Sequence, residues 1–543
     1  MSDVGAICYQ WRGPQIVTGM RGEMTRPTLM RLGLLAGLML LLTLQVLARP
    51  LLPIDETRYL SVAWEMHLSG DPFHLTRNFD SYSHKPPLLF WLINLVWLVT
   101  GVVEWAGRLI GPACTVALVW LSGRLARRLW PEDVGIDLRA MAVLAGFTVF
   151  LSYAGATMFD ALLALPVVLG IGVIWRIGQG GAGWRLWALF GVVLAFGVYA
   201  KGPVILVHLA VPLLLIRLWA DHPPNWGAMA RGFGLALAVA LGLVAVWLVP
   251  ALLTGDGAFA HELLVSQTVD RVAGGMAHDR PVWFLTALLP VLLFPFGWAL
   301  RLWPAVVRAG RGDSAGRLVA IWGVAALVLF SLISGKQAHY LIPEYPALAL
   351  VIARATGSMR QRWGSVAPLG FAALGVGALA VAAGLVPVSG GFALADDPRW
   401  PLAVFGVVCL GLGAVAWRLP LVAGHALAGA GLSLAIHGLI AATALYPAFD
   451  AHTLVPRLKA AEAGGLAVSG MPYNAEFNFV ARLTQPVAVL EGPGIAAWAA
   501  AHPGGLLIGP VGRVDTTVPP AEVTDYGGRT IGLWPAGSLT FPG

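Results

Sequence analysis

The chain has 543 residues, of which 58% are apolar and only 12% are charged, and its mean hydropathy is +0.76. These values exclude a soluble globular domain and predict a membrane protein with many spans. The net charge of +7 comes mainly from arginines between apolar blocks, which indicates membrane orientation rather than nucleic-acid binding. Cys8, Cys114 and Cys409 are too scattered to predict a disulfide framework or a metal cluster.

The first apolar run, residues 32–47, follows a segment with four arginines (residues 1–31). No small-residue cleavage signature follows the run, so we expect an uncleaved anchor. The positive-inside rule then places residues 1–31 in the cytoplasm and the first loop, residues 49–105, outside it.

The next apolar block, KPPLLFWLINLVWLVTG, is ambiguous because it is shorter than the roughly 20 residues that a spanning helix needs. If it crossed the membrane, Arg124, Arg127 and Arg128 would face outward, against the charge rule. We therefore expect an interfacial helix here and thirteen crossings in all. The predicted spans are 32–47, 106–123, 139–158, 161–177, 184–200, 203–219, 232–252, 282–302, 318–334, 341–353, 365–387, 401–417 and 420–446.

Residues 32–447 are thus predicted to form an all-α polytopic membrane domain, and residues 448–543 a small α/β domain outside the cytoplasm. In this last part, strands are expected near 466–470, 486–491 and 505–511, with helices over 474–483 and 494–503. No internal repeat is visible in the sequence, which disfavours the transporters built from inverted repeats.

The polar residues that remain are predicted to collect on the outer face. An amphipathic helix over 55–68, ended by Gly70, carries Asp55 in its first turn, where the aspartate either caps the helix or serves a site. Lys85 precedes two prolines that fix its place, and either binds a lipid phosphate or anchors the helix at the headgroups. Asp160 lies at the outer end of a span, directly before the next apolar helix, where it either caps that helix or faces the site. This distribution favours an interfacial site over a conduction path.

Four motifs together resemble the membrane glycosyltransferases that include the lipid A aminoarabinose transferases and, more distantly, the protein O-mannosyltransferases. They occur in the order found in that family, within residues 30 to 355. The motifs are DETRYLSVAWEMHLSGD, HKPPLLFWL, MFDALLAL and GKQAHYLIPEYPALAL. The resemblance implies a GT-C fold, a donor sugar linked to a polyprenyl (undecaprenyl) monophosphate, no required cofactor, and transfer at the periplasmic face of the inner membrane.

Carried over residue by residue, the resemblance implies catalytic roles for Asp55 and Asp160, and donor-phosphate binding by Lys85, Arg271 and Tyr340. Further candidates for substrate binding are Glu56, Tyr59, Tyr82, Lys201 and Lys336. His84 stands where relatives commonly have an acidic residue, and residues 336–339 also depart from the family pattern, so the acceptor stays open. His84 and His278 are weak candidates for a metal site, because a third ligand is missing.

Fixed positive charge suits this chemistry, because the leaving group is a phosphate monoester anion. Asp55 would act as a base for a hydroxyl acceptor, or would orient a lipid A phosphate that is already nucleophilic. In-line attack would invert the anomeric centre. The alternatives are an acceptor that is a protein or a polysaccharide, a lipid-linked sugar flippase or transporter, and a non-catalytic envelope assembly protein. The expected partners are membrane lipids, the lipid-linked donor and a lipid or glycan acceptor.

Overall fold

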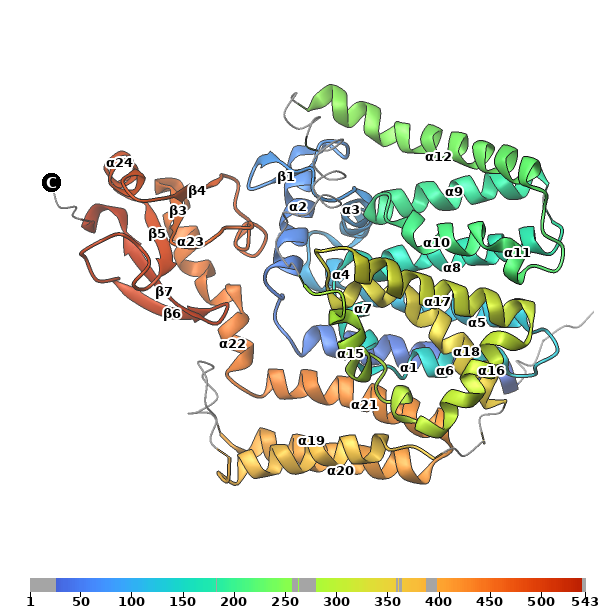
Figure 1. Ribbon diagram of the computed structural model, residues 1–543. Helices are drawn as coiled ribbons and strands as arrows, with labels where there is room; N and C mark the ends of the chain where they lie inside the picture. The colour runs from blue at the N-terminus through green and yellow to red at the C-terminus, as the bar shows by residue number, and fades with distance from the viewer. Residues whose placement is uncertain are drawn as a thin grey trace, which may run out of the picture.

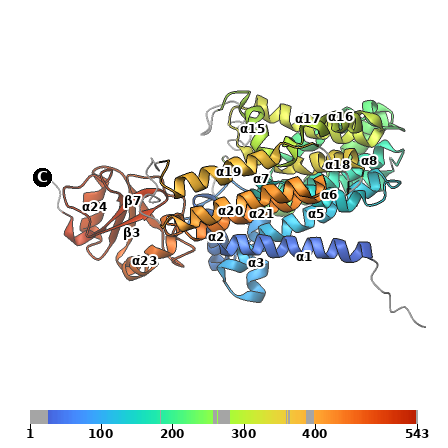
Figure 2. The ribbon, with the colours of Figure 1, turned by 90° about the horizontal axis from the view of Figure 1, so that it is seen from below.

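A computed structural model describes residues 26–181, 183–255, 262, 280–357, 360, 364–386 and 398–539. Most of these residues form a bundle of helices that run roughly side by side (Figure 1), and a small sheet domain lies beyond one end of the bundle (Figure 2). The fold class predicted from the sequence is therefore confirmed: a helical polytopic membrane domain followed by a C-terminal α/β domain.

Eight of the described helices are long and apolar enough to cross a membrane. They are α1 (Arg26–Leu47), α4 with α5 (Glu104–Leu129), α8 (Phe159–Gly178), α9 (Trp184–Lys201), α12 (Trp226–Thr254), α17 (Ser314–Leu332), α20 (Trp400–Arg418) and α21 (Leu421–Ala441). Each coincides with one of the predicted spans.

The other five predicted spans are broken or short. Residues 139–158 fall on α6 (Ile136–Leu144) and α7 (Thr148–Ala154), which are bent by 73° against each other and form a broken span or a re-entrant loop. The remaining four fall on shorter helices, and their crossing of the membrane stays a prediction. They correspond to α10 (Ile205–Leu214) with α11 (Ile216–Trp219), α15 (Phe284–Leu292), α18 (Tyr345–Thr356) and α19 (Ala367–Ala382).

Proline explains two of these interruptions, because it removes a backbone donor and clashes with the preceding turn. Pro212 lies near the end of α10, and Pro290 lies near the end of α15. After α15 the chain continues through two short 3-10 turns, Phe296–Trp298 and Leu300–Leu302, into α16 (Trp303–Gly312). The bundle is therefore less regular than the apolar pattern alone suggests.

The segment between α1 and α4 forms two helices and a hairpin at the end of the bundle nearest the sheet domain (Figure 1). Helix α2 (Asp55–Ser69) ends at Gly70, whose φ of 69° is the left-handed conformation that stops helices. Helix α3 (Leu88–Thr100) begins directly after Pro87, as predicted. The strands β1 (Thr76–Arg77) and β2 (Asp80–Ser81) pair antiparallel between them.

The C-terminal domain is reached through α22 (Leu445–Phe449) and α23 (Val455–Ala461), and contains one mixed five-stranded sheet and helix α24 (Gly494–Ala501). Its strand order is β4-β3-β5-β7-β6, with β3 parallel to β4 and β5 and the other neighbours antiparallel. The strands are β3 (Leu466–Ser469), β4 (Val487–Leu490), β5 (Leu506–Pro510), β6 (Glu522–Tyr526) and β7 (Arg529–Pro535). The first three and α24 match the predicted elements.

The helix predicted over 474–483 is wrong, because this segment is a loop. Ala475 and Arg482 have φ angles of 63° and 52°, which a right-handed helix does not accept. The loop instead bonds to α2: the Ser61 hydroxyl donates to the Ala475 carbonyl at 2.7 Å, and the Asn478 amide donates to Glu65 at 3.0 Å. Contacts across the fold therefore override the helical pattern, and they fasten the C-terminal domain to α2.

Candidate active site

Asp55 is the first residue of α2, and its side chain is 39% exposed. The Tyr59 hydroxyl donates to Asp55 Oδ1 at 2.9 Å, and the Arg58 guanidinium pairs with the same carboxylate. The helix N-terminus adds a partial positive charge that also favours an anion there. The aspartate is thus oriented by two neighbours while remaining accessible to a substrate.

Arg58 was not singled out from the sequence, although its spacing of three residues from Asp55 on one helix is a signal for such a pair. Burial lowers the pKa of Arg58, but Tyr82, Tyr59 and Asp55 outweigh that effect, so the pKa is raised and the group stays charged. Burial and the Asp55 charge raise the pKa of Tyr59, which keeps its phenol protonated as a donor. A fixed cation and a fixed donor therefore flank the carboxylate.

Phe159 connects α2 to the other predicted site residues. The Tyr59 ring meets the Phe159 ring edge-on, with centroids 4.8 Å apart. The ammonium of Lys85, just before α3, lies 5.6 Å from the centre of the same ring. Asp160 follows Phe159 in the first turn of α8. Three segments far apart in sequence therefore meet around one aromatic ring.

Asp160 and Lys201 form a buried ion pair, with Lys201 Nζ 2.5 Å from Asp160 Oδ1 and side-chain exposures of 11% for the lysine and 3% for the aspartate. The Lys201 ammonium also lies 4.9 Å from the centre of the Tyr340 ring. Tyr340 belongs to the 3-10 helix η4 (Ala338–Glu344), which packs against α8. The pair brings the end of α9 and η4 to the start of α8.

His339, which was not among the predicted site residues, lies within electrostatic range of this group. Burial lowers the pKa of His339, and Lys201 and Lys85 lower it further, while Asp160 and Asp55 oppose the shift. The predicted residues Asp55, Lys85, Asp160 and Lys201 therefore act electrostatically on one histidine. The signals for it in the sequence were its adjacency to Tyr340 and the departure of residues 336–339 from the family pattern.

Two predicted substrate-binding residues are structural instead. The Lys336 side chain is buried, and its ammonium donates to the carbonyls of Arg280 at 2.8 Å and Pro281 at 3.3 Å. Glu56 is also buried, and its carboxylate binds the Arg49 guanidinium. Backbone carbonyls bind the Lys336 ammonium, and an internal arginine binds the Glu56 carboxylate. Neither side chain is therefore available to bind a substrate.

Tyr82 is buried, with its ring 5.3 Å from the His84 ring between centroids. His84 Nε2 lies 3.1 Å from Glu262 Oε1. Arg271 and His278 lie outside the described residues, so their assignments stay predictions. Among the described residues, no group of three or more His, Cys, Asp or Glu side chains is arranged to hold a metal ion.

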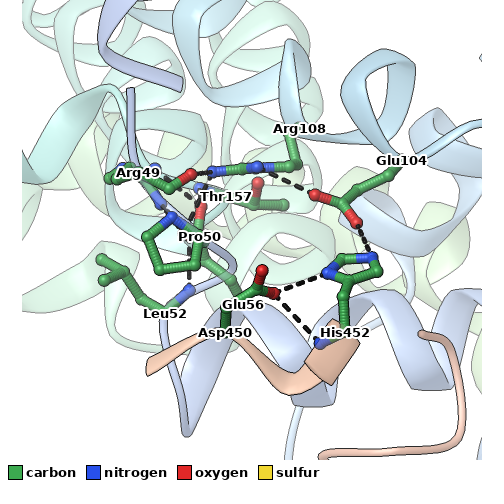
Figure 3. Close-up of polar contacts among 9 residues, drawn as sticks. All are labelled: Arg49, Pro50, Leu52, Glu56, Glu104, Arg108, Thr157, Asp450 and His452. Atoms are coloured by element: carbon green, nitrogen blue, oxygen red, sulfur yellow. Dashed lines mark hydrogen bonds and ion pairs between the residues drawn. The ribbon is translucent and has the colours of Figure 1, made fainter. Parts of the chain in front are cut away.

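A chain of charged groups connects α4, which contains Glu104 and Arg108, to the start of the C-terminal domain (Figure 3). Arg108 donates to Glu104 Oε1 at 2.9 Å, and Glu104 Oε2 lies 3.0 Å from His452 Nε2. The other ring nitrogen of His452 lies 2.7 Å from Asp450 Oδ1. The hydrogen bonds from Asp450 and Glu104 raise the pKa of His452 to about 9. The imidazolium therefore holds the start of the C-terminal domain against α4.

The contribution of this histidine to stability is expected to depend on pH. Because the folded-state pKa lies above the ordinary value of 6.5, the stabilisation is fully present below pH 6.5 and is lost as the pH rises through about 9. The thermal midpoints of the wild type and His452→Gln should therefore differ at neutral pH and converge above about pH 9. His502→Gln is the control in the same domain. A midpoint difference that does not change with pH would contradict this assignment.

Sequence comparison identifies relatives over part of the chain. Residues 84–250 match the family model described as dolichyl-phosphate-mannose-protein mannosyltransferase. An undecaprenyl phosphate-α-4-amino-4-deoxy-L-arabinose arabinosyl transferase of Pseudomonas fluorescens is 28% identical over 332 residues, 59% of this chain and 56% of that protein. One from Sodalis glossinidius is 30% identical over 60% of this chain and 59% of that protein. The matched region thus spans less than two thirds of these relatives.

Structural similarity extends further along the chain. The crystal structure of ArnT from Cupriavidus metallidurans bound to undecaprenyl phosphate superposes with a TM-score of 0.74 at 19% identity, covering 94% of this chain and 99% of that one. Its apo structure gives the same TM-score. The superposition therefore covers more of this chain than the sequence matches do. This chain is therefore similar over part of its length to the aminoarabinose transferases, and it has the fold of ArnT.

Proposed function

We propose that the protein is a glycosyltransferase that moves a sugar from an undecaprenyl monophosphate-linked donor onto lipid A or another envelope glycolipid. The reaction takes place at the periplasmic face of the inner membrane. The observation that carries the proposal is the convergence of Asp55, Lys85 and the Asp160–Lys201 pair around Phe159 at one end of the bundle. The names of the curated relatives and the undecaprenyl phosphate bound to ArnT support the donor class.

In this reaction the bond between the anomeric carbon and the donor phosphate breaks, and the undecaprenyl phosphate leaves as an anion. Lys85 and Arg271 stabilise the negative charge on that phosphate, and the Tyr340 hydroxyl donates a hydrogen bond to it. Asp55 lies on the side of the acceptor, where Arg58 and Tyr59 hold its carboxylate in one orientation. Attack from the face opposite the phosphate inverts the anomeric centre.

Asp55 has one of two roles, which depend on the acceptor. It removes the proton from a hydroxyl acceptor as that oxygen attacks the anomeric carbon. With a lipid A phosphate, the acceptor needs no base, and the aspartate orients it and stabilises the positive charge that develops on the sugar ring. Asp160 pairs with Lys201, and the pair fixes the position of the lysine ammonium next to Tyr340.

The direct test is mass spectrometry of lipid A from cells that lack the protein and are complemented with the wild type or with Asp55→Asn. A sugar-sized mass that returns only with the wild type would establish both the transfer and the need for the carboxylate. Identical lipid A in all strains would exclude this acceptor, and the same strains would then be compared for their protein and polysaccharide glycans.

Replacing Lys85 by methionine is expected to weaken donor binding. Removing one charge-assisted hydrogen bond to a phosphate should raise KM for the donor by about 10- to 100-fold, with a smaller change in kcat. The purified variant is compared with the wild type in steady-state kinetics against the undecaprenyl-linked sugar. Lys85→Arg, which keeps the charge, is the matched variant and should retain most of the affinity. An unchanged KM in Lys85→Met would contradict the phosphate assignment.

A further inference from the structure

The Glu56 carboxylate is buried beside the candidate active site, and both of its oxygens are occupied. Oε1 accepts a hydrogen bond from Arg49 at 2.9 Å and one from the backbone N–H of Thr157 at 2.7 Å. Oε2 accepts from the Leu52 backbone N–H at 3.1 Å and from the second arm of the Arg49 guanidinium. The side chain is 1% exposed, so this carboxylate binds protein groups and is closed to a substrate.

These bonds join two segments of the chain that each carry an acidic site residue. Glu56 directly follows Asp55 at the start of α2, and Thr157 lies three residues before Asp160 in the turn that leads into α8. One carboxylate therefore connects the backbone beside Asp55 to the backbone beside Asp160. The Tyr59–Phe159 ring contact described above spans the same gap.

A second arginine, Arg108, fixes the chain segment that leads into α2 (Figure 3). Arg108 donates to the carbonyls of Arg49 at 2.9 Å and Pro50 at 3.2 Å, which fixes the chain just before α2. Burial raises the pKa of Glu56, but Arg49, Arg108 and the Thr157 N–H outweigh it and lower the pKa to about 2. The carboxylate is thus ionised at every physiological pH, and removing its charge leaves the buried Arg49 guanidinium without a counter-charge.

We propose that Glu56 is a positioning residue, whose carboxylate ties the N-terminus of α2 to the turn before α8 and so sets the geometry of Asp55 relative to the Asp160–Lys201 pair. This inference rests on the proposed glycosyl transfer. It assigns Glu56 a role in the chemical step without contact to the substrate, because a reacting group displaced by about 1 Å can slow a reaction by about 10²-fold.

The test is Glu56→Gln in the purified full-length protein in lipid nanodiscs. The amide has the shape of the carboxylate but lacks its charge and one acceptor, so kcat should fall by about 10- to 100-fold with KM for the undecaprenyl-linked donor nearly unchanged. Glu65→Gln is the matched control. Glu65 is also buried on α2, but it binds the N–H groups of Asn78 and Phe79 and not the turn before α8.

A double variant separates positioning from a general loss of stability. The rate of sugar transfer is measured with radiolabelled sugar in single-turnover experiments. In the Asp55→Asn background, Glu56→Gln should slow this transfer by less than about threefold, because the Asp55 carboxylate that Glu56 positions is already absent. The same loss in both backgrounds would overturn the proposal. If Glu56→Gln does not fold, Arg49→Lys replaces it, since lysine keeps the charge but loses the two-armed contact.

A readout independent of activity keeps this inference separate from the proposed function. Hydrogen exchange of the peptide that covers residues 155–160 should be faster in Glu56→Gln than in the wild type, and unchanged in Glu65→Gln. Unchanged exchange in Glu56→Gln would overturn the inference. If the wild type transferred no sugar from undecaprenyl-linked donors, the proposed function would fail, and faster exchange would still support the connection through Glu56.

Discussion

Asp55→Asn is expected to lower sugar transfer by about 10²- to 10⁴-fold while donor binding stays intact. The substitution removes the charge of a carboxylate that Arg58 and Tyr59 hold in place at the exposed start of α2. Because the residue lies toward the acceptor and apart from the donor phosphate in our proposal, the defect should appear in kcat and not in KM for the donor.

The measurement compares turnover with equilibrium binding of the undecaprenyl-linked donor, using the wild type and the variant in nanodiscs. Asp80→Asn is the matched control, because Asp80 is an exposed aspartate of the same segment between α1 and α4. Turnover by Asp55→Asn close to that of the wild type would show that the catalytic assignment is wrong. A loss of donor affinity in this variant would instead move Asp55 to the phosphate side of the site.

Lys201→Met is expected to destabilise the protein by about 3–5 kcal/mol. Asp160 is almost fully enclosed, and Lys201 is its ion-pair partner at 2.5 Å. Removing the lysine leaves a buried carboxylate without its hydrogen-bonded counter-charge, which is more costly than losing both members of the pair. Methionine fills a similar volume, so the loss reports the charge rather than a cavity.

Thermal unfolding in detergent measures this effect as a lower midpoint for Lys201→Met. The double variant Asp160→Asn/Lys201→Met is the control and should recover most of the lost stability, because neither charge is then buried alone. Both variants should be inactive, since each alters the site. A single variant as stable as the wild type would contradict the buried pair.

Local features of this chain follow from its sequence, because they depend on neighbours along the chain. The apolar blocks predict the eight long helices, and Gly70 and Pro87 predict where α2 ends and where α3 begins. The positions of Asp55 at the start of α2 and Asp160 at the start of α8 were also predicted correctly. Helix periodicity, proline geometry and charge placement are all properties of short segments.

Only the tertiary structure decided which polar side chains are exposed and can therefore reach a substrate. Asp55 and Glu56 are adjacent carboxylates in the sequence, yet Asp55 is partly exposed and Glu56 is enclosed. The difference depends on Thr157, about a hundred positions away, whose N–H binds Glu56. Lys336 is buried for the same kind of reason, since its partners are the carbonyls of Arg280 and Pro281.

Contacts with distant segments also explain why residues 474–483 form a loop and not the predicted helix. Its partners Ser61 and Glu65 lie more than four hundred residues earlier in the chain. A residue pattern over ten positions indicates only the local preference for secondary structure. A buried polar group, in contrast, must form hydrogen bonds, and its partners can come from any part of the fold. The sequence by itself therefore determined the eight long apolar helices and the starts of α2, α3 and α8, which depend on neighbouring residues. The folded chain decided which polar side chains meet, because burial and pairing are set by contacts between distant segments.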